Sequence, residues 1–244
     1  MKETAGKIVQ LDSVRFSWPG HSSTVLAVDE FGLDRGERVF LRGPSGSGKT
    51  TLLGLIAAVL TPQSGRIVVD DVDLGRLRGG QRDQFRVDHI GLVFQQFNLL
   101  PFLSVHENIQ LPCRFSPLRR ARAMNNNQSL ADEADRLLHA MQLSASELGG
   151  RRVSDLSVGQ QQRVAVARAL IGSPALVIAD EPTSALDEET RQAFLELLFA
   201  EVTASDCTLL FVSHDASLAT HFDRSVDLRE INRAVTREAQ EVMP

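Results

Sequence analysis

Short apolar runs alternate with turn residues between residues 8 and 41, and this pattern predicts β-strands. The breaks include Pro19-Gly20 and Arg35-Gly36, residue pairs that mark turns. Runs of valine, isoleucine, leucine and aromatic residues between such breaks are typical of strands. The runs cover residues 8–11, 14–18 and 24–28. We therefore expect an antiparallel β layer that leads into a further strand at residues 39–41.

Longer apolar patterns predict helices farther along the chain. Residues 51–60 are almost continuously apolar, and Thr61-Pro62 is expected to end this helix because proline cannot continue it. Residues 105–148 are predicted to be mainly helical, with 131–143 the clearest segment and Asn125-Asn126-Asn127 a loop.

A later helix is predicted from Ser157 to about Ile171. Ser157 and Gln160 have the S-x-x-Q spacing of a capping box, which places Ser157 at a helix N-terminus. Further apolar runs predict strands at residues 65–70, 89–94, 176–179 and 208–212. A chain of 244 residues with these elements fits one large α/β domain that carries a subdomain.

Composition places the chain among ordinary globular proteins, with 43% hydrophobic and 23% charged residues. No apolar run approaches the roughly 20 residues of a membrane-spanning helix, and the N-terminus lacks a signal-peptide pattern. The net charge of −5, from 26 Lys plus Arg against 31 Asp plus Glu, argues against broad electrostatic binding to nucleic acid or anionic lipid. We expect a cytosolic protein that meets a membrane only through a protein partner.

Cysteine and histidine usage predicts no built-in metal site. Cys113 and Cys207 lie far apart in the sequence and are interpreted as reduced structural residues. The six histidines include no H-x-x-x-H pair, so Mg²⁺ arriving with a nucleotide is the only metal expected.

Residues 43–51 read GPSGSGKTT and match the phosphate-binding pattern G-x-x-x-x-G-K-[ST]. Glycines let successive N–H groups point at phosphate oxygens, and the following helix N-terminus adds partial positive charge. Lys49 is expected to reach the β- and γ-phosphates, and the Thr50 hydroxyl to bind Mg²⁺. The alternative is a chance glycine-rich turn. A predicted strand before the loop and a predicted helix after it weigh against that alternative.

Polar side chains follow two of the predicted buried strands. Asp180 and Glu181 end the strand at residues 176–179, and His214 follows the strand at 208–212. Ligands bind at the carboxyl ends of strands in parallel α/β sheets. Two adjacent carboxylates in such a place are costly without a cation or a donor. A lone histidine is more often structural, but its place at this edge favours a functional role.

Two apolar features stay open at this point. Trp18 is the only tryptophan, and an exposed ring beside a phosphate site could stack on a nucleobase, worth about 1–3 kcal/mol, while a core position is equally compatible. The run at residues 97–103 either is buried or forms an exposed patch that marks a partner site.

In their order along the chain, these segments resemble the motifs of the nucleotide-binding subunits of ABC transporters. The matching segments are GPSGSGKTT for the Walker A loop, Gln95 for the Q-loop, LSVGQ for the signature, LVIADE for Walker B, Ser184-Ala185-Leu186-Asp187 for the D-loop and His214 for the switch histidine. The phrases FQQFNLLPFLSVHENI and ADEPTSALD are most similar to the subgroup that powers lipoprotein release, macrolide export and related mechanical work on the inner membrane.

The resemblance implies an ATPase that binds ATP and Mg²⁺ between two subunits facing head to tail, as a homodimer. Glu181 would be the general base, and Asp180 would bind Mg²⁺ through water. His214 would contact the γ-phosphate, and Gln95 would report its presence to the helical subdomain. Trp18 falls where the family has its adenine-stacking aromatic, which favours stacking.

The residues implied to act at this site fall into three overlapping sets. The nucleotide-binding set is Trp18, Gly43, Pro44, Ser45, Gly46, Ser47, Gly48, Lys49, Thr50, Thr51, Ser157, Gly159, Gln160 and Asp187. The catalytic set is Lys49, Gln95, Glu181 and His214, and the Mg²⁺ set is Thr50, Gln95 and Asp180.

The implied fold is a P-loop NTPase core with a mainly parallel sheet, an antiparallel β subdomain and an inserted α-helical subdomain. Residues 1–95 and 174–230 would form the core with the β subdomain, 96–173 the helical subdomain, and 231–244 a C-terminal tail. The implied partner is an integral membrane permease, which places the chain at the cytoplasmic face of the inner membrane, without membrane insertion or nucleic-acid binding.

Two other functions are weighed against this one. Soluble ABC-type ATPases that act on DNA or ribosomes usually carry a coiled-coil insertion, a second cassette or a basic surface, and this acidic sequence shows none. A non-hydrolysing ATP-dependent clamp is disfavoured by Glu181 and His214.

The sequence departs from the family at Val158, where the usual LSGGQ is LSVGQ. A β-branched residue at positive φ is a genuine outlier, so we expect a negative φ at this position.

Overall fold

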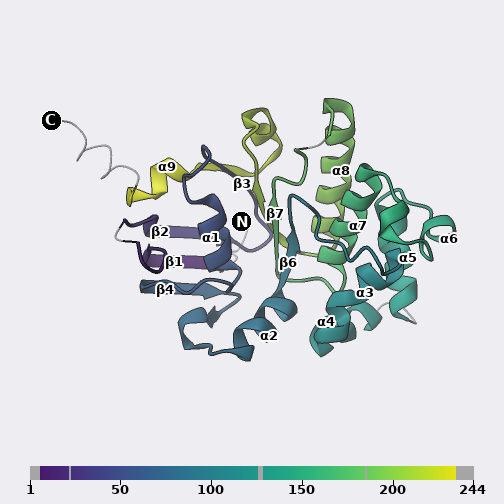
Figure 1. The fold of residues 1–244 in the computed structure, drawn as a ribbon, viewed down its shortest axis with the longest axis horizontal. Coiled ribbons are helices and arrows are strands. Elements are labelled where there is room, and N and C mark those ends of the chain that lie inside the picture. The colour runs from purple at the N-terminus through teal and green to yellow at the C-terminus, as the bar shows by residue number, and fades with distance from the viewer. Residues whose placement is uncertain (1–5, 22, 126–128, 185, 235–244) are drawn as a thin grey trace. The chain divides into compact units, whose positions relative to one another are not determined.

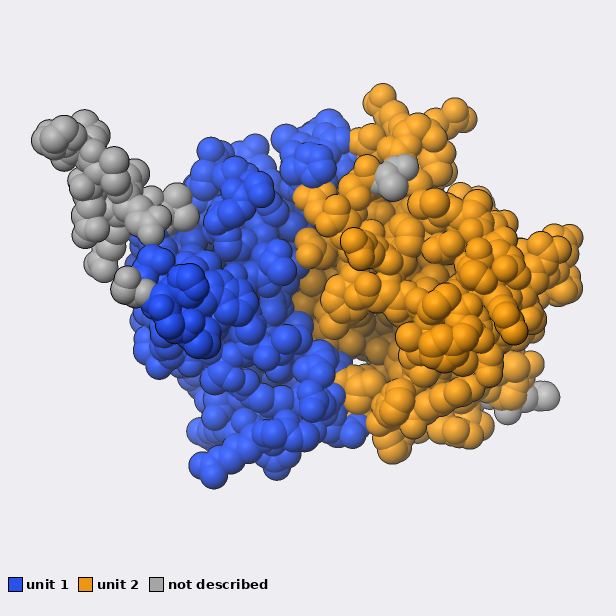
Figure 2. All heavy atoms as spheres, viewed as in Figure 1, with its two compact units in different colours: residues 1–86, 208–244 blue, residues 87–207 orange. Residues whose placement is uncertain are grey.

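The computed structural model describes residues 6–21, 23–125, 129–184 and 186–234. Contacts within the chain group it into two compact units, one drawn from residues 1–86 and 208–244 and the other from residues 87–207 (Figure 2). The sequence predicted different boundaries, which separate a nucleotide-binding core, a helical subdomain and a C-terminal tail. That division stays a prediction. Of the predicted C-terminal tail, residues 235–244 lie outside the described residues.

The first unit contains the predicted antiparallel layer, a four-stranded sheet in the order β2-β1-β4-β5 (Figure 1). Its strands are β1 (Lys7–Phe16), β2 (Leu26–Asp34), β4 (Ser64–Val69) and β5 (Val72–Asp73). The two apolar runs predicted before residue 19 form the single strand β1. Ser13 interrupts their alternation with a left-handed φ of 51°, and the pairing of β1 with β4 shifts register between Asp12 and Arg15.

The first unit also contains parallel strands, with β3 (Arg38–Arg42) paired to both β8 (Thr208–Val212) and β9 (Arg224–Asp227). All five residues of β8 and the three central residues of β3 are buried, as continuous apolar strands in parallel sheets require. Phe40 stacks on Phe211 with ring centroids 6.3 Å apart. β3 delivers the glycine loop at its carboxyl end, as predicted.

The helix after the loop, α1 (Lys49–Ile56), is shorter than expected. The prediction that it runs to residue 60 and stops at Thr61-Pro62 is wrong. Ala58 adopts a left-handed φ of 57°, and the N–H groups of Val59 and Leu60 turn back to the Gly54 carbonyl at 2.9 Å each. The apolar run therefore continues through a tight reversal that ends the helix before the proline is reached.

Short elements complete the first unit. The 3₁₀ turns η1 (Leu74–Arg76) and η3 (Ala216–His221) follow β5 and β8, and α9 (Leu228–Ile231) follows β9. The helix α2 (Gly80–His89) carries the chain across residue 86 into the second unit.

The second unit combines two parallel strands, β6 (Ile90–Val93) and β7 (Leu176–Asp180), with a group of helices (Figure 1). The helical elements are α3 (Val105–Phe115), α4 (Pro117–Asn125), α5 (Leu130–Ala140), α6 (Ala145–Leu148), η2 (Val153–Asp155), α7 (Val158–Leu170) and α8 (Glu188–Ala204). The helical prediction for residues 105–148 is thus confirmed over the described residues. Of the predicted asparagine loop, Asn125 ends α4, and residues 126 and 127 lie outside the described part.

Two details of packing fix the signature helix α7 in this unit. A Cβ at Gly91 on β6 would collide with the Ala169 carbonyl oxygen, so only glycine lets α7 approach the strand this closely. Arg119 on α4, buried to 2% exposure, donates hydrogen bonds to the Ala169 and Ile171 carbonyls at 2.6 and 2.8 Å. Burial lowers the pKa of Arg119 to about 10. These bonds satisfy carbonyls at the C-terminal end of α7 that no helical N–H reaches.

The two cysteines, Cys113 and Cys207, are free thiols in the buried part of the second unit. Burial raises the pKa of both, that of Cys207 to about 12, so both are held as protonated thiols at neutral pH. The prediction that they are reduced structural residues is confirmed.

Candidate functional site

The phosphate loop, residues 43–48, owes its shape to glycines in the left-handed region. Gly46 and Gly48 have φ of 78° and 98°, values that side-chain-bearing residues rarely adopt. Gly48 is also enclosed, since a Cβ there would lie 3.3 Å from the Val25 carbonyl oxygen. Gly48 caps α1, so the loop passes directly into a helix N-terminus, where N–H groups and the helix dipole favour an anion.

Side chains of the loop add a cation and an unused hydroxyl. The Lys49 ammonium donates to the carbonyl oxygens of Gly43 and Pro44, at 2.5 and 3.0 Å, so it folds along the loop rather than away from it. Ser47 is buried to 5% exposure, and its Oγ has no hydrogen-bond partner among the described residues. An ammonium, an unpaired buried hydroxyl and a helix N-terminus fit a phosphate group. Thr50 is exposed and Thr51 is buried.

Trp18 lies on the surface of the same unit, 44% exposed, with its ring edge-on to Phe16 at 5.1 Å and 87°. The core alternative for Trp18 is therefore wrong. Phe16 is buried at 5% exposure and supports the ring from one side. Stacking of Trp18 on a nucleobase stays a prediction.

His214 lies at the same edge of the parallel strands as the phosphate loop. Val212 at the end of β8 pairs with Leu41, the second-last residue of β3, so the two strands end at the same edge. The Ser213 N–H donates to the Leu41 carbonyl at 3.3 Å, and His214 follows it as an exposed residue. The structure thus brings together the loop and the predicted switch histidine.

In the second unit, Gln95, Asp180 and Glu181 gather at one strand edge. β6 and β7 pair in parallel up to Val93 and Ala179. Asp180 and Glu181 follow Ala179 directly, and Gln95 is the second residue after Val93. Gln95 is exposed, whereas both carboxylates are partly buried. Glu181 has a left-handed φ of 48°. Strained conformations of this kind in non-glycine residues cluster at functional sites.

The signature segment begins α7 with the predicted capping box. The Ser157 Oγ accepts the Gln160 N–H at 3.3 Å, and the Gln160 Oε1 accepts the Ser157 N–H at 2.9 Å. Val158 is the first helical residue, does not have a positive φ, and is 53% exposed. The predicted negative φ is confirmed. Gly159 is open, because a Cβ there would meet nothing within 4 Å.

Asp187, the last residue of the predicted D-loop, is the N-cap of α8. Its carboxylate accepts the Thr190 N–H at 2.9 Å and the Thr190 hydroxyl at 3.0 Å. The bond from the Thr190 backbone is the main cause that lowers the pKa of Asp187. Ser184 is exposed, and Ala185 lies outside the described residues.

The apolar run at residues 97–103 is a loop clamped from two helices, a feature that the sequence did not reveal. Phe97 and Asn98 both have left-handed φ, 59° and 48°, and Arg168 on α7 donates to their carbonyls at 2.5 and 2.6 Å. Buried Asn108 on α3 exchanges hydrogen bonds with the Leu100 backbone at 2.8 and 3.0 Å. The loop is therefore fixed by polar clamps while Phe102 stays 69% exposed.

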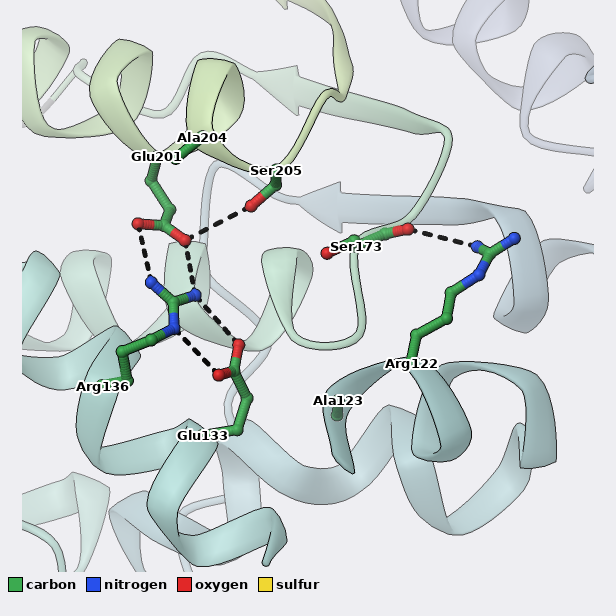
Figure 3. A pocket seen from close by; sticks show the side chains of 8 residues that line it. All are labelled: Arg122, Ala123, Glu133, Arg136, Ser173, Glu201, Ala204 and Ser205. Carbon is green, nitrogen blue, oxygen red and sulfur yellow. Dashed lines mark hydrogen bonds and ion pairs between the residues drawn. The ribbon is translucent and has the colours of Figure 1, made fainter. Parts of the chain in front are cut away.

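A pocket of about 240 Å³ lies elsewhere in the second unit, lined by residues of α4, α5 and α8 (Figure 3). Arg136 donates to the Glu133 carboxylate at 2.8 and 2.9 Å and to the Glu201 carboxylate at 2.6 and 3.2 Å. These bonds raise the pKa of Arg136, those to Glu133 most. Both carboxylates are nearly buried and use Arg136 as their shared partner. None of the predicted site residues lines the pocket. The bonds of Arg136 join α5 to α8.

Asn232, like the clamps on the loop at residues 97–103, is a feature that no sequence pattern revealed. It follows α9, is fully buried, and its side chain donates to the Ser47 carbonyl of the phosphate loop at 3.1 Å. An asparagine after a short mixed segment, LREI, has no distinctive spacing, so only the fold shows its partner.

Metal and membrane features can be stated for the described residues. There, no group of three or more His, Cys, Asp or Glu side chains is placed to hold a metal by itself. Nor is any helix in this part of the chain both long and apolar enough to cross a membrane. The Mg²⁺ set Thr50, Gln95 and Asp180 stays a prediction.

Comparison with known proteins gives a family for this architecture. Residues 26–184 match the family model described as ABC transporter. The chain is 38% identical to the lipoprotein-releasing system ATP-binding protein LolD of Syntrophotalea carbinolica, over 84% of this chain and 87% of that protein. It is 34% identical to the macrolide export ATP-binding/permease protein MacB of Rhodopseudomonas palustris, over 93% of this chain but only 33% of that protein. The chain thus spans about a third of the length of such fused relatives.

A solved structure agrees with these matches. The dimeric post-hydrolysis state of the ATP-binding cassette MJ0796 of Methanocaldococcus jannaschii, bound to ADP and Pi, superposes with a TM-score of 0.76. Its sequence is 32% identical, and the match covers 90% of this chain and 93% of that one. The predicted α/β fold, with parallel strands and an antiparallel sheet, is thereby confirmed.

Proposed function

Because the chain belongs to the ABC transporter family, as an ATPase domain that takes ATP with Mg²⁺, we propose that it is the subunit that powers a separate membrane permease. The observation that carries the proposal is the phosphate loop, in which a left-handed glycine pair, the Lys49 ammonium and the unpaired Ser47 hydroxyl converge ahead of α1. This arrangement suits the binding of a phosphate group.

The residues of the loop would bind and orient the nucleotide. Lys49 would exchange its bonds to the loop carbonyls for the β- and γ-phosphates, while backbone N–H groups of residues 43–51 hold the same oxygens. Trp18 would take the adenine ring. Thr50, Gln95 and Asp180 would hold Mg²⁺, which when bound neutralises charge that develops on the transferred phosphoryl group.

Glu181 would take the proton of the attacking water at its carboxylate, and His214 would donate to the γ-phosphate. Glu181 follows Asp180 directly at the end of β7 and has a left-handed φ. One strand end would thereby supply both a metal ligand and a base.

The signature residues would act on the ATP of a second subunit, in a head-to-tail homodimer. Ser157, Gly159 and Gln160 lie at the N-terminus of α7, where N–H groups and the helix dipole favour a phosphate. Asp187 would contribute from the D-loop. The dimeric state of the solved cassette MJ0796, which matches 90% of this chain, supports this assembly.

The permease would dock on the loop at residues 97–103. This loop combines a 69% exposed Phe102 with half-buried Leu99 and Leu100, and its backbone is fixed by Asn108 and Arg168. A rigid, partly apolar loop suits a helix-in-groove partner. The similarity to the LolD and MacB proteins favours lipoprotein or lipid release, or export, at the cytoplasmic face of the inner membrane.

No observation favours the alternative of a soluble ABC-type ATPase on nucleic acid or ribosomes. The net charge of −5 of this chain opposes binding to the phosphate backbone of a nucleic acid.

The decisive experiment purifies the tagged chain from detergent-solubilised membranes and measures two things. We expect Mg²⁺-dependent ATP hydrolysis, and an integral membrane protein that co-purifies in stoichiometric amount. Hydrolysis with nucleic acid or ribosomes as the only partner would contradict the transport role.

A further inference from the structure

Asn232 has a fully buried side-chain amide whose donor and acceptor groups are all engaged. Its Oδ1 accepts the N–H of Ala27 at 2.9 Å and that of Ala234 at 3.1 Å. Its Nδ2 donates to the carbonyls of Val25 at 3.0 Å and Ser47 at 3.1 Å. A single amide therefore joins three parts of the first unit that are far apart in sequence.

The partners of Asn232 belong to the surroundings of the nucleotide. Ser47 lies inside the phosphate loop, and Val25 and Ala27 lie at the beginning of β2. A Cβ on Gly48 would lie 3.3 Å from the Val25 carbonyl oxygen and 3.5 Å from the Asn232 Nδ2. The amide and the beginning of β2 thus form the surface on which the loop rests.

The bond to Ser47 also fixes the direction of a neighbouring donor. The Ser47 carbonyl and the Gly48 N–H belong to one planar trans peptide, in which the two groups point in opposite directions. Because Asn232 holds the Ser47 carbonyl on its own side of the loop, the Gly48 N–H must face the other side. Gly48 is the N-cap of α1, so this N–H lies next to the helix N-terminus.

The segment before Asn232 is itself held in place. The Asn232 N–H donates to the Leu228 carbonyl at 2.8 Å, and residue 232 forms an isolated antiparallel bridge with Val28. Leu228 borders the loop as well, because its Cβ would lie 3.3 Å from a Cβ on Gly43. Residues 228–232 therefore reach the loop at both of its ends.

We propose that Asn232 is a positioning residue for the nucleotide, which sets the phosphate loop in its binding conformation before ATP arrives. The inference rests on the proposed function, because it takes the loop as the phosphate site. Loss of the amide frees the Ser47–Gly48 peptide to rotate, and the ordering of the loop then opposes nucleotide binding. Affinity falls while the chemical step, once the site is saturated, changes little.

Two variants and a matched control test the proposal. Asn232→Asp keeps the shape and the Oδ1 acceptor but removes the Nδ2 donors, and Asn232→Ala removes both. The control is Thr208→Val, which deletes the hydrogen bond that the buried Thr208 hydroxyl accepts from the Gly36 N–H at 2.9 Å, at the opposite end of β8 from the loop. Calorimetric titration with MgADP reports affinity without hydrolysis, and thermal unfolding reports stability.

Asn232→Asp loses the two bonds that Nδ2 donates, and Asn232→Ala loses all four bonds of the amide. We expect both variants to bind MgADP at least about tenfold more weakly, because the bond to the Ser47 carbonyl is lost in each. The KM for ATP should rise by a similar factor with kcat within about twofold. Thr208→Val should lower the unfolding temperature comparably and leave MgADP affinity unchanged. Wild-type affinity in the Asp variant, or equal weakening by Thr208→Val, would overturn the positioning role. Failure of the unmodified chain to bind MgADP would overturn the proposed function first, and this inference with it.

Discussion

Glu181 has a backbone conformation that its sequence position does not predict. It follows the buried strand β7 and has a φ of 48°, which ordinary side chains avoid. The sequence placed the carboxylate at the strand end, because an apolar run ended in Asp-Glu. The left-handed turn could not be predicted, since local preference at glutamate opposes it. Such a conformation persists only where the surrounding structure enforces it.

Substitution of Glu181 tests its role as the base. Glu181→Gln keeps the size of the side chain but removes its capacity to accept a proton. We expect MgATP hydrolysis to fall at least about 100-fold while ATP binding survives. Single-turnover hydrolysis and equilibrium ATP binding measure the two effects separately. Lys49→Ala is the contrasting variant, which should weaken binding itself. Near-normal hydrolysis in Glu181→Gln would exclude this residue as the base.

The structure explains why valine can replace the family's usual glycine at position 158. The residue is helical and 53% exposed, so its side chain points to solvent and its N–H is retained at the helix N-terminus. We expect Val158→Gly to change ATP turnover by less than about threefold, in line with a glycine cost of 0.5–1 kcal/mol in a helix. Gly159→Asp should abolish turnover, because it adds a negative charge beside the phosphate. A wild-type chain without activity that Val158→Gly rescues would contradict this reading.

At the scale of elements, β9 and α9 depend on the buried carboxylate of Asp227. Its pKa is lowered to about 2, first by the hydrogen bonds from the Arg229 guanidinium at 2.6 and 3.0 Å. A depressed folded pKa stabilises the fold above the unfolded value of about 4. The stabilisation is lost as pH falls from about 4 to about 2.

Asp227→Asn should therefore lower the free energy of unfolding at pH 7 by at most about 2 kcal/mol, with the difference from wild type shrinking towards pH 2. Denaturant unfolding at several pH values measures this. The exposed pair of Asp29 with Arg15 provides the control, and Asp29→Asn should change stability by less than about 0.5 kcal/mol. An equal effect of the two substitutions at pH 7 would show that burial of Asp227 is not decisive.

The loop at residues 97–103 is held by two helices, α3 and α7. Leu99→Ser with Leu100→Ser should leave the ATPase rate of the isolated chain unchanged. Co-purification with the permease should fall at least about tenfold, since serine removes apolar surface of the half-buried leucines that a docked partner would cover. Val59→Ser, at an exposed apolar position outside this loop, is the control. Loss of ATPase activity together with co-purification would instead mean that the two leucines belong to the core.

The elements also show what could be predicted. Strands and the capped helix α7 could be predicted because apolar runs and the Ser157–Gln160 spacing are local signals. The end of α1 could not, since a reversal at Ala58 leaves the apolar composition unchanged. The clamps from Arg168 and Asn232 could not either, because their partners lie 70 and 185 residues away. A local sequence pattern therefore indicates which residues could act at the site. The contacts that hold those residues in place come from distant parts of the chain, and a local pattern does not show them.

At the scale of the whole molecule, the proposed assembly predicts a change in oligomeric state. If ATP lies between two chains, a variant that binds but does not hydrolyse it should trap the dimer. We expect Glu181→Gln with MgATP to elute from a gel-filtration column as a dimer of about twice the 26.8 kDa of one chain, and with MgADP as a monomer. A monomer under both conditions would contradict the head-to-tail arrangement.

The exposed ring of Trp18 has a further consequence for the whole chain. The protein contains one tryptophan and no tyrosine, and that tryptophan is 44% exposed beside Phe16 in the proposed adenine position. Its intrinsic fluorescence therefore comes from a single known point rather than from a sum over many rings. Trp18 is therefore an intrinsic fluorescence probe of the proposed adenine site. A shift in the emission maximum on adding nucleotide would report a change in the surroundings of that ring alone.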